Sequence, residues 1–225
     1  RYNPPMNLAV AERNLKEAKQ ILDQLGVVFL LYSGSCLGVT RDNAFIPWDD
    51  DIDLLSVIGI NGLTEQSIDI VMAAFGDKGY FVEVLEGAYS KTVVTMKAFV
   101  RLSWDCARII DDNIYAYPRV RLPAQLFTQP KEIGFLEEKF LVPNPPEEYL
   151  RLKYGAEWMV PKKAGEYERD VVERVPDGGP VGRPSRLRVL DAAGQPVPGA
   201  EVVLVGCGRT KTDERGYAEI ILPDP

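Results

Sequence analysis

The spacing of apolar residues changes twice within the first sixty positions of the chain. Between residues 7 and 25, apolar side chains recur every three or four positions, which predicts one amphipathic helix that ends at Gly26. Residues 27–32 (VVFLLY) form an uninterrupted apolar and aromatic run, which predicts a buried strand. Residues 51–57 begin with alternating acidic and apolar side chains and predict a second strand.

Downstream, the same reasoning predicts a helix and several strands. A helix is expected from about residue 64 to 75, with the threonine at position 64 as its N-cap. Residues 80–86 predict one strand, and residues 92–110 form a stretch long enough for two. An Asp-Asp-Asn turn then leads into a strand at 114–117. Asn144, followed by two prolines and a glutamate, predicts the start of a helix that ends at Gly155.

The character of the chain changes near its C-terminal end. Residues 176–185 contain three prolines and three glycines, which predicts a linker. We therefore expect a domain of mixed helices and strands at 1–175 and a small all-β module at 186–225. Four short strand-like pieces of this module lie at 186–192, 200–206, 209–213 and 217–223. Forty residues give only a marginal core, so we expect the module to be truncated or supported by a neighbour.

The composition narrows the chemistry that the chain can perform. Histidine is absent from all 225 residues, which excludes Ser-His-Asp and Cys-His catalysis, histidine bases and histidine zinc ligands. Cys36, Cys106 and Cys207 are scattered without a C-x-x-C pair, as expected for reduced, packed thiols of a cytoplasmic protein. The formal net charge of −7 argues against broad binding to nucleic acid or anionic membrane.

The sequence also bears on membrane attachment. We expect no transmembrane segment, because no apolar run is long enough to span a bilayer, and peripheral membrane contact stays open. Because the chain begins with Arg1 rather than Met, we expect it to be a fragment or a trimmed form of a longer protein.

Four carboxylates crowd into the five positions 49–53. In a strand, Asp51 and Asp53 point to one face, and Asp49 joins them if the strand extends backwards. Carboxylates at this spacing can share a divalent cation. Mg²⁺ suits them because it prefers oxygen ligands, and Mn²⁺ is the alternative.

A solvated turn and a calcium loop compete with a magnesium site as the role of the acidic run. Most runs of charged residues form solvated turns without a function. The flanking residues 45–48 and 54–55 are too apolar for a loosely solvated segment. A calcium loop of the EF-hand type needs Gly at its sixth position and Glu at its twelfth. Leu54 and Ile60 occupy those positions, so we reject the calcium loop.

The residues around this cluster resemble a known family. Gly34 lies between two serines after the predicted strand, where small residues would let the backbone approach a phosphate. This order of strand, Gly-Ser turn and acidic strand resembles the nucleotidyltransferase fold typified by DNA polymerase β. More narrowly, residues 33–54 and 140–161 resemble the LicD family, which includes the fukutin-related proteins. The matching positions of the first segment are Leu37, Gly38, Arg41, Phe45, Ile46, Pro47, Trp48, Asp49, Asp51 and Asp53.

The resemblance implies a fold and an activity. The implied fold class is α+β, a mixed sheet with flanking helices. The implied activity is transfer of phosphocholine or a phosphopolyol from a CDP-activated donor to a hydroxyl of a glycan or lipid-linked sugar. In that reaction Asp49, Asp51 and Asp53 would hold the metal. The chain departs from the family at Asp42-Asn43, where many members carry a His-Lys-like pair, and a zinc site is not expected.

The fold normally supplies a third carboxylate from a later strand, in an apolar-Asp-apolar context. Asp105 fits this context and would be a further metal ligand or the catalytic base, so the implied catalytic residues are Asp51, Asp53 and Asp105. Asp112 is the alternative. The competing interpretation makes Asp105 a strand-end carboxylate that pairs with Arg101 or Arg108.

The implied substrate-binding residues are Gly34, Ser35, Arg41, Lys97 and Arg119. Arg41 would neutralise phosphate charge, but a surface ion pair with Asp42 or Asp50 is the competing interpretation. Lys97 and Arg119 are candidate basic wall residues that are as readily explained by exposure to solvent.

Two alternatives to the phosphotransferase stay open. The chain could be a nucleotidyltransferase that moves the nucleoside monophosphate itself, or a non-catalytic member that binds nucleotide or glycan.

The C-terminal module resembles the carboxypeptidase-regulatory-like, transthyretin-type β-sandwich repeats, through positions that include Gly194 to Val197 and Thr212 to Tyr217. Such modules generally act as spacers or as units that bind glycans or proteins.

Overall fold

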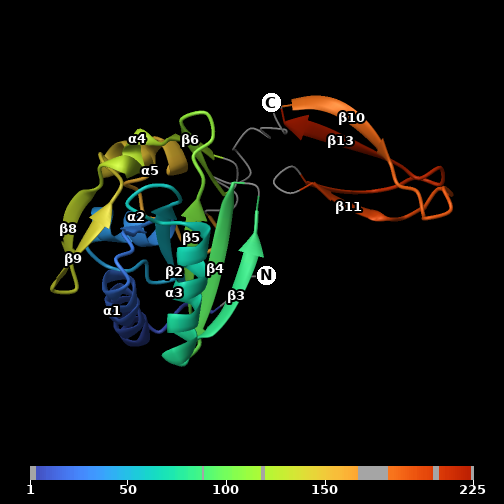
Figure 1. The fold of residues 1–225 in the computed structure, drawn as a ribbon. Coiled ribbons are helices and arrows are strands. Elements are labelled where there is room, and N and C mark those ends of the chain that lie inside the picture. The colour runs from blue at the N-terminus through green and yellow to red at the C-terminus, as the bar shows by residue number, and fades with distance from the viewer. Residues whose placement is uncertain (1–3, 88, 118–119, 167–181, 205–207, 224–225) are drawn as a thin grey trace. The chain divides into compact units, whose positions relative to one another are not determined.

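The computed structural model describes residues 4–87, 89–117, 120–166, 182–204 and 208–223 (Figure 1). The chain divides into two compact units, one of residues 1–85 and 89–175 and one of residues 86–88 and 176–225. Most of the predicted linker lies outside the described residues. Among those that are described, no helix is long and apolar enough to cross a membrane.

The first unit combines helices with a mixed sheet. Its helices are α1 (Leu8–Gln24), α2 (Ser33–Asp42), α3 (Glu65–Asp77), α4 (Gln125–Thr128) and α5 (Pro146–Tyr154). The sheet contains β1 (Leu30–Leu31), β2 (Asp51–Val57), β5 (Val100–Ala107), β4 (Ser90–Lys97) and β3 (Phe81–Glu86), in that spatial order. Two hairpins complete the unit: β6 (Asn113–Ala116) with β7 (Val120–Pro123), and β8 (Lys131–Phe135) with β9 (Glu138–Val142).

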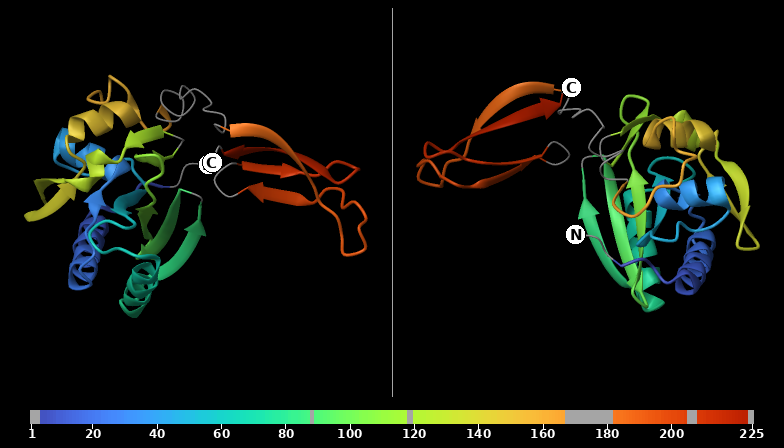
Figure 2. Two further views of the ribbon diagram at one scale, coloured as in Figure 1. Left: turned by 45° about the horizontal axis from the view of Figure 1, so that its top comes forward. Right: turned by 180° about the vertical axis from the view of Figure 1, so that it is seen from behind.

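Strand direction in this sheet is mixed. β2 and β5 run parallel, whereas β1 with β2 and β4 with β5 run antiparallel. Figures 1 and 2 show α3 on one face of strands β3, β4 and β5. This arrangement confirms the predicted α+β class with a mixed sheet and flanking helices.

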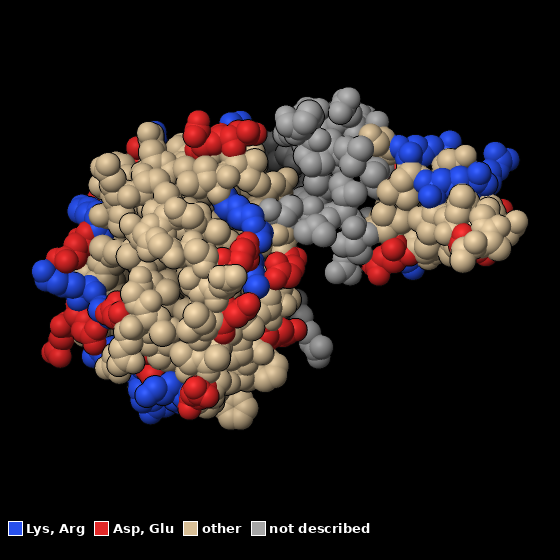
Figure 3. All heavy atoms as spheres, viewed as in Figure 1, with Lys and Arg blue, Asp and Glu red and all other residues tan. Residues whose placement is uncertain are grey.

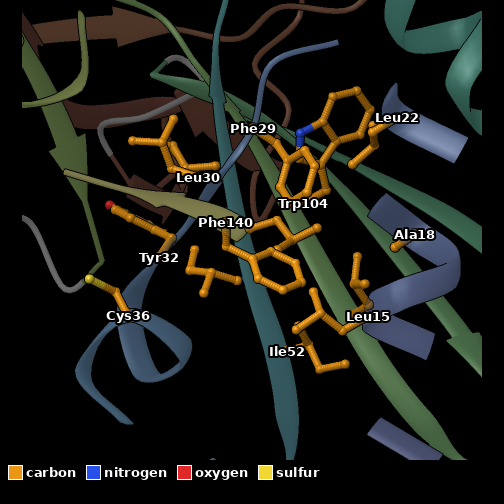
Figure 4. Packing of buried hydrophobic residues seen from close by; sticks show 14 of the residues in the cluster. Leu15, Ala18, Leu22, Phe29, Leu30, Tyr32, Cys36, Ile52, Trp104 and Phe140 are labelled. Atoms are coloured by element: carbon orange, nitrogen blue, oxygen red, sulfur yellow. The ribbon is translucent and has the colours of Figure 1, made fainter. Parts of the chain in front are cut away.

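The core forms on the face of the sheet where apolar positions of β2 and β5 point toward α1. Leu54 lies opposite Trp104 in the parallel register, and both side chains are fully buried. Leu15, Ala18 and Leu22 of α1 join them, which explains the three- and four-residue spacing of that helix (Figure 4). The other face of β2 and β5 is thereby left to Asp51, Asp53 and Asp105.

Two cysteines belong to this core. Cys36 and Cys106 are buried free thiols, and burial raises the pKa of Cys36 to about 12. The expectation of packed, reduced thiols is confirmed for these two. Cys207 lies outside the described residues.

Three local predictions need correction. The predicted strand at 27–32 is reduced to Leu30–Leu31, and the predicted Gly-Ser turn is the first turn of α2. The helix predicted to start at Asn144 begins at Pro146, with Pro145 as its N-cap, and Asn144 Nδ2 donates to the Gln129 carbonyl oxygen at 3.0 Å. The hairpin formed by β8 and β9 was not anticipated.

The N-terminus of α3 is capped as predicted. Thr64 Oγ1 accepts a hydrogen bond from the Ser67 backbone N–H at 3.1 Å, and the Ser67 hydroxyl accepts one from the Thr64 N–H. Replacing Thr64 by Ala is expected to lower the free energy of unfolding by about 1 kcal/mol, because a helix N–H loses its acceptor. Urea denaturation would measure the change. An unchanged unfolding midpoint would contradict this role of the cap.

The second unit is built from β-strands alone among its described residues. β10 (Gly182–Arg188) pairs antiparallel with β13 (Tyr217–Pro223), and β11 (Glu201–Leu204) pairs antiparallel with β12 (Gly208–Lys211). Each of these strands overlaps one of the four predicted β segments, but β10 begins at Gly182 and includes residues 182–185, which were expected to belong to the linker. The transthyretin-type resemblance stays a prediction. Basic side chains gather on the face of this unit that Figure 3 shows. The guanidinium of Arg186 lies 4.1 Å from the centre of the Tyr217 ring.

Candidate functional site

A cavity of about 400 Å³ lies in the first unit, within the size range of small-molecule sites. Side chains from β2, β4, β5, α2 and α5 line it, together with the segment that follows α5. One part of its wall is acidic, formed by Asp49, Asp50, Asp51, Asp53 and Asp105. The structure therefore brings the four clustered aspartates and the predicted third carboxylate to one place.

The parallel pairing of β2 and β5 produces the acidic wall. Asp51 lies opposite Arg101 and Asp53 lies opposite Ser103 in the register, so their side chains share one face of the sheet. The Asp51 carboxylate accepts hydrogen bonds from Arg101 Nε at 3.0 Å and from Ser103 Oγ at 2.9 Å. Arg101 also reaches Asp50 at 3.2 Å, so one guanidinium holds two of the carboxylates.

The N-terminus of α2 approaches the same carboxylates. The Gly34 N–H donates to Asp53 Oδ2 at 2.9 Å, and the Ser33 N–H donates to the Tyr149 hydroxyl at 3.0 Å. A Cβ atom on Gly34 would overlap Asp49 Oδ2 and lie 3.2 Å from Asp53 Oδ2. Glycine is therefore required here by close approach to the two carboxylates, not by an unusual backbone angle.

Burial and mutual repulsion disfavour ionisation of the clustered aspartates. Burial raises the pKa of Asp53 well above its usual range, and the charges of Asp51 and Asp49 raise it further. Burial and the charges of Asp51 and Asp50 raise the pKa of Asp49 to about 7. Burial also raises the pKa of Asp51, although Arg101 opposes the shift. A bound cation would remove this electrostatic cost.

The donor set fits a hard divalent cation. Carboxylate oxygens of Asp49, Asp50 and Asp51 lie within 4.8 Å of one another. The predicted set of metal ligands contained Asp53 instead of Asp50. Asp53 Oδ2 and Asp49 Oδ2 both lie next to Gly34. Oxygen donors at this density are the ligands that Mg²⁺ and Mn²⁺ prefer.

Asp105, rather than Asp112, joins the cavity. Burial raises the pKa of Asp105, and its Oδ1 accepts a hydrogen bond from Thr92 Oγ1 at 2.5 Å. Asp112 is exposed on the turn before β6. The arginines that the competing interpretation paired with Asp105 have other carboxylate partners: Arg101 pairs with Asp51, and Arg108 pairs with Glu65 at 2.6 Å.

The expected phosphate-binding residues have mixed outcomes. Gly34 and Arg41 line the cavity, and Arg41 also pairs with Asp42 at 2.7 Å. Ser35 is buried beneath it, and its hydroxyl oxygen accepts the Asp53 backbone N–H at 2.9 Å. Ser35 thus joins α2 to β2, which corrects its expected role as a donor to phosphate.

Lys97 does not belong to the cavity wall. Successive side chains of a strand point to opposite faces of the sheet, and Lys97 and Thr92 are an odd number of positions apart in β4. Thr92 faces the cavity, so Lys97 points to the opposite face, where its Nζ pairs with Glu17 at 2.6 Å. The expectation that Lys97 would contact substrate is corrected on this ground. Arg119 lies outside the described residues.

Sequence reasoning missed a basic residue and an aromatic wall. Lys153 lines the cavity from α5, four positions after the fully buried Tyr149. Residues four positions apart lie on the same face of a helix, so Lys153 lies on the buried face that contains Tyr149. This spacing is the sequence feature from which Lys153 could have been predicted. Tyr117, Tyr154 and Trp158 also line the cavity, and Trp48 Nε1 donates to the Lys162 carbonyl oxygen at 2.6 Å.

Comparison with solved structures finds partial alignments at low sequence identity. The solution structure of the antibiotic-resistance factor ANT(2'')-Ia aligns with a TM-score of 0.44 and 14% identity, over 61% of this chain and 66% of that chain. A putative nucleotidyltransferase from Thermotoga maritima aligns with a TM-score of 0.42 and 13% identity, over 66% of this chain and 88% of that chain.

Sequence comparison identifies relatives of this chain. Ribitol-5-phosphate transferase FKTN from Homo sapiens is 30% identical over 185 residues, and the protein of the same name from Macaca fascicularis is 28% identical. Each alignment covers 75% of this chain, which spans 37% of the relative's length. Residues 26–144 match the family described as "LicD/FKTN/FKRP, nucleotidyltransferase domain". This match covers more than half of the chain and includes Gly34 and all five cavity aspartates, so the chain belongs to the LicD family.

Proposed function

We propose that this chain is a metal-dependent phosphotransferase acting on glycans. It would move a phosphopolyol such as ribitol phosphate, or phosphocholine, from a CDP-activated donor to a hydroxyl of a cell-surface glycan or lipid-linked sugar. The observation that carries the proposal is the convergence of Asp51, Asp53 and Asp105, from two parallel strands, on one cavity at the N-terminus of α2. The family membership and the names of the relatives support the same reaction class.

The metal requirement follows from the carboxylates of this chain. Asp49, Asp51 and Asp53 would hold Mg²⁺, with Mn²⁺ as an alternative, and Asp50 lies within reach of the same site. When bound, the ion would neutralise charge on the diphosphate of the donor. Arg101 keeps Asp51 in position through its ion pair.

Asp105 would act as the base. In the proposed step, the oxygen of the acceptor hydroxyl forms a bond to the distal phosphorus of the donor, and the bond from that phosphorus to the bridging oxygen breaks. CMP leaves, and the hydroxyl proton passes to Asp105, whose raised pKa suits proton acceptance. Thr92 fixes the orientation of the carboxyl group through its hydrogen bond. Tyr117, Tyr154 and Trp158 offer rings on which the cytosine could stack.

A donor panel tests this function. The purified protein would be incubated with CDP-ribitol, CDP-glycerol or CDP-choline and a glycan acceptor, with Mg²⁺ or with EDTA, and the products identified by mass. We expect release of CMP and a phospho-linked adduct on the acceptor with at least one donor, and neither product in EDTA. Addition of the nucleoside monophosphate to the acceptor would instead identify a nucleotidyltransferase. Nucleotide binding without any turnover would identify a non-catalytic member.

A further inference from the structure

Lys153 is a buried cation within the acidic cavity. It lies on the last turn of α5, and only 4% of its surface is exposed to solvent. Its Nζ lies 5.0 Å from the centre of the Tyr32 ring and 5.7 Å from that of Tyr154. A lysine is almost never buried this far unless a partner compensates its charge.

The partners of Lys153 within the protein are weak. Its Nζ donates to the Tyr117 carbonyl oxygen at 3.2 Å, which is a neutral acceptor. Among the residues that the structure describes, no carboxylate lies within 4.0 Å of this nitrogen. Arg41 and Arg101, which line the same cavity, each contact a carboxylate directly. An ammonium group has three N–H donors, so Lys153 keeps donors available for a ligand.

The charges around Lys153 favour an anionic ligand at this point. The charges of Asp53 and Asp105 raise the pKa of Lys153 against the larger lowering effect of burial. Both carboxylates are therefore near enough to act on the lysine without contacting it. A diphosphate in this cavity would be repelled by the aspartates, and it needs positive charge both from a metal and from the protein.

We propose that Lys153 binds the diphosphate of the nucleotide-linked donor from the α5 side of the cavity. This inference rests on the proposed function, which supplies the diphosphate. The buried ammonium acts as a point charge for a phosphate oxygen, and the surrounding rings keep water away from the contact. The cytidine part of the donor does not interact with Lys153.

Binding measurements with the whole chain test the assignment. The affinities of CDP, cytidine and inorganic pyrophosphate would be measured by calorimetry in Mg²⁺ for the wild type and for Lys153→Met. We expect Lys153→Met to weaken CDP and pyrophosphate at least about 10-fold and to leave cytidine within about twofold. Lys153→Arg keeps the charge and is expected to retain the preference for CDP over cytidine. Lys97→Met, on the opposite face of the sheet, is the matched control and is expected to bind all three ligands like the wild type.

The outcomes separate this assignment from the proposed function. Unchanged CDP and pyrophosphate affinity in a folded Lys153→Met protein would overturn the role of Lys153. An equal loss of cytidine affinity would also overturn it, because a packing defect would then explain the result. If the wild type binds pyrophosphate but not CDP, the proposal of a CDP-linked donor is wrong. The role of Lys153 is then decided by comparing the pyrophosphate affinities of the wild type and Lys153→Met. Failure of the wild type to bind either phosphate ligand would overturn both.

Discussion

Replacing Asp53 by Asn is expected to reduce metal-dependent transfer at least about 100-fold while leaving the fold intact. Asp53 points from β2 into the cavity and is one of the three proposed metal ligands. An amide is a much poorer ligand for Mg²⁺, yet its oxygen can still accept the Gly34 N–H that Asp53 now accepts. The measurements are CMP release and the calorimetric affinity for Mg²⁺.

The Asp53→Asn substitution is also expected to change the thermal stability of the metal-free protein. The pKa of Asp53 is raised in the folded state, so its ionisation as pH rises lowers the stability of the metal-free fold, and Asn removes that cost. We therefore expect Asp53→Asn to melt at or above the wild-type temperature at neutral pH without metal. Asp23→Asn removes an exposed carboxylate paired with Lys19 on α1 and is expected to leave transfer unchanged. Full activity of Asp53→Asn would refute the role of Asp53 in the site.

Replacing Gly34 by Ala is expected to have the second-largest effect, a loss of transfer and of Mg²⁺ affinity of about 10- to 100-fold. The added Cβ would overlap Asp49 Oδ2. Because that atom ends a short side chain, the aspartate can rotate away, and the change then displaces a metal ligand instead of unfolding the protein. We expect the melting temperature of the metal-free protein to move by only a few degrees, which corresponds to about 1 kcal/mol.

Gly76 provides a matched control for this substitution. It lies in the last turn of α3, and a Cβ atom there would meet no atom within 4 Å. Gly76→Ala is expected to keep full transfer and to stabilise the fold by up to about 1 kcal/mol, because alanine is the better helix former. Equal losses of activity in the two variants would show that close approach at Gly34 is not the cause.

The acidic strand could be predicted because its signal is local. Residues 51–57 were expected to form a strand, and β2 has the same bounds, since alternating acidic and apolar side chains leave one consistent register. Asp105 was expected from its apolar neighbours, and the parallel pairing of β5 with β2 brings it into the cavity. The family resemblance and the α+β class followed from the same segments.

Other features depend on contacts that local patterns do not encode. Serine and glycine are poor helix formers, so the first turn of α2 could not be predicted. In the structure, hydrogen bonds from its first N–H groups to Tyr149 and Asp53 stabilise that turn. The hairpin of β8 and β9 turns at Leu136 and Glu137, which have φ values of 53° and 65° without the usual Gly or Asn signal. Lys153 was missed because a lysine ordinarily indicates an exposed position.

We expect Asp49, Asp51 and Asp53 to bind one divalent cation in the cavity beside Gly34. Crystals grown with Mn²⁺ and CDP would test it through the anomalous signal of manganese. We expect a peak bonded to oxygens of Asp49, Asp51 and Asp53, in contact with the diphosphate. A cavity without a peak, at Mn²⁺ concentrations that support turnover, would contradict it.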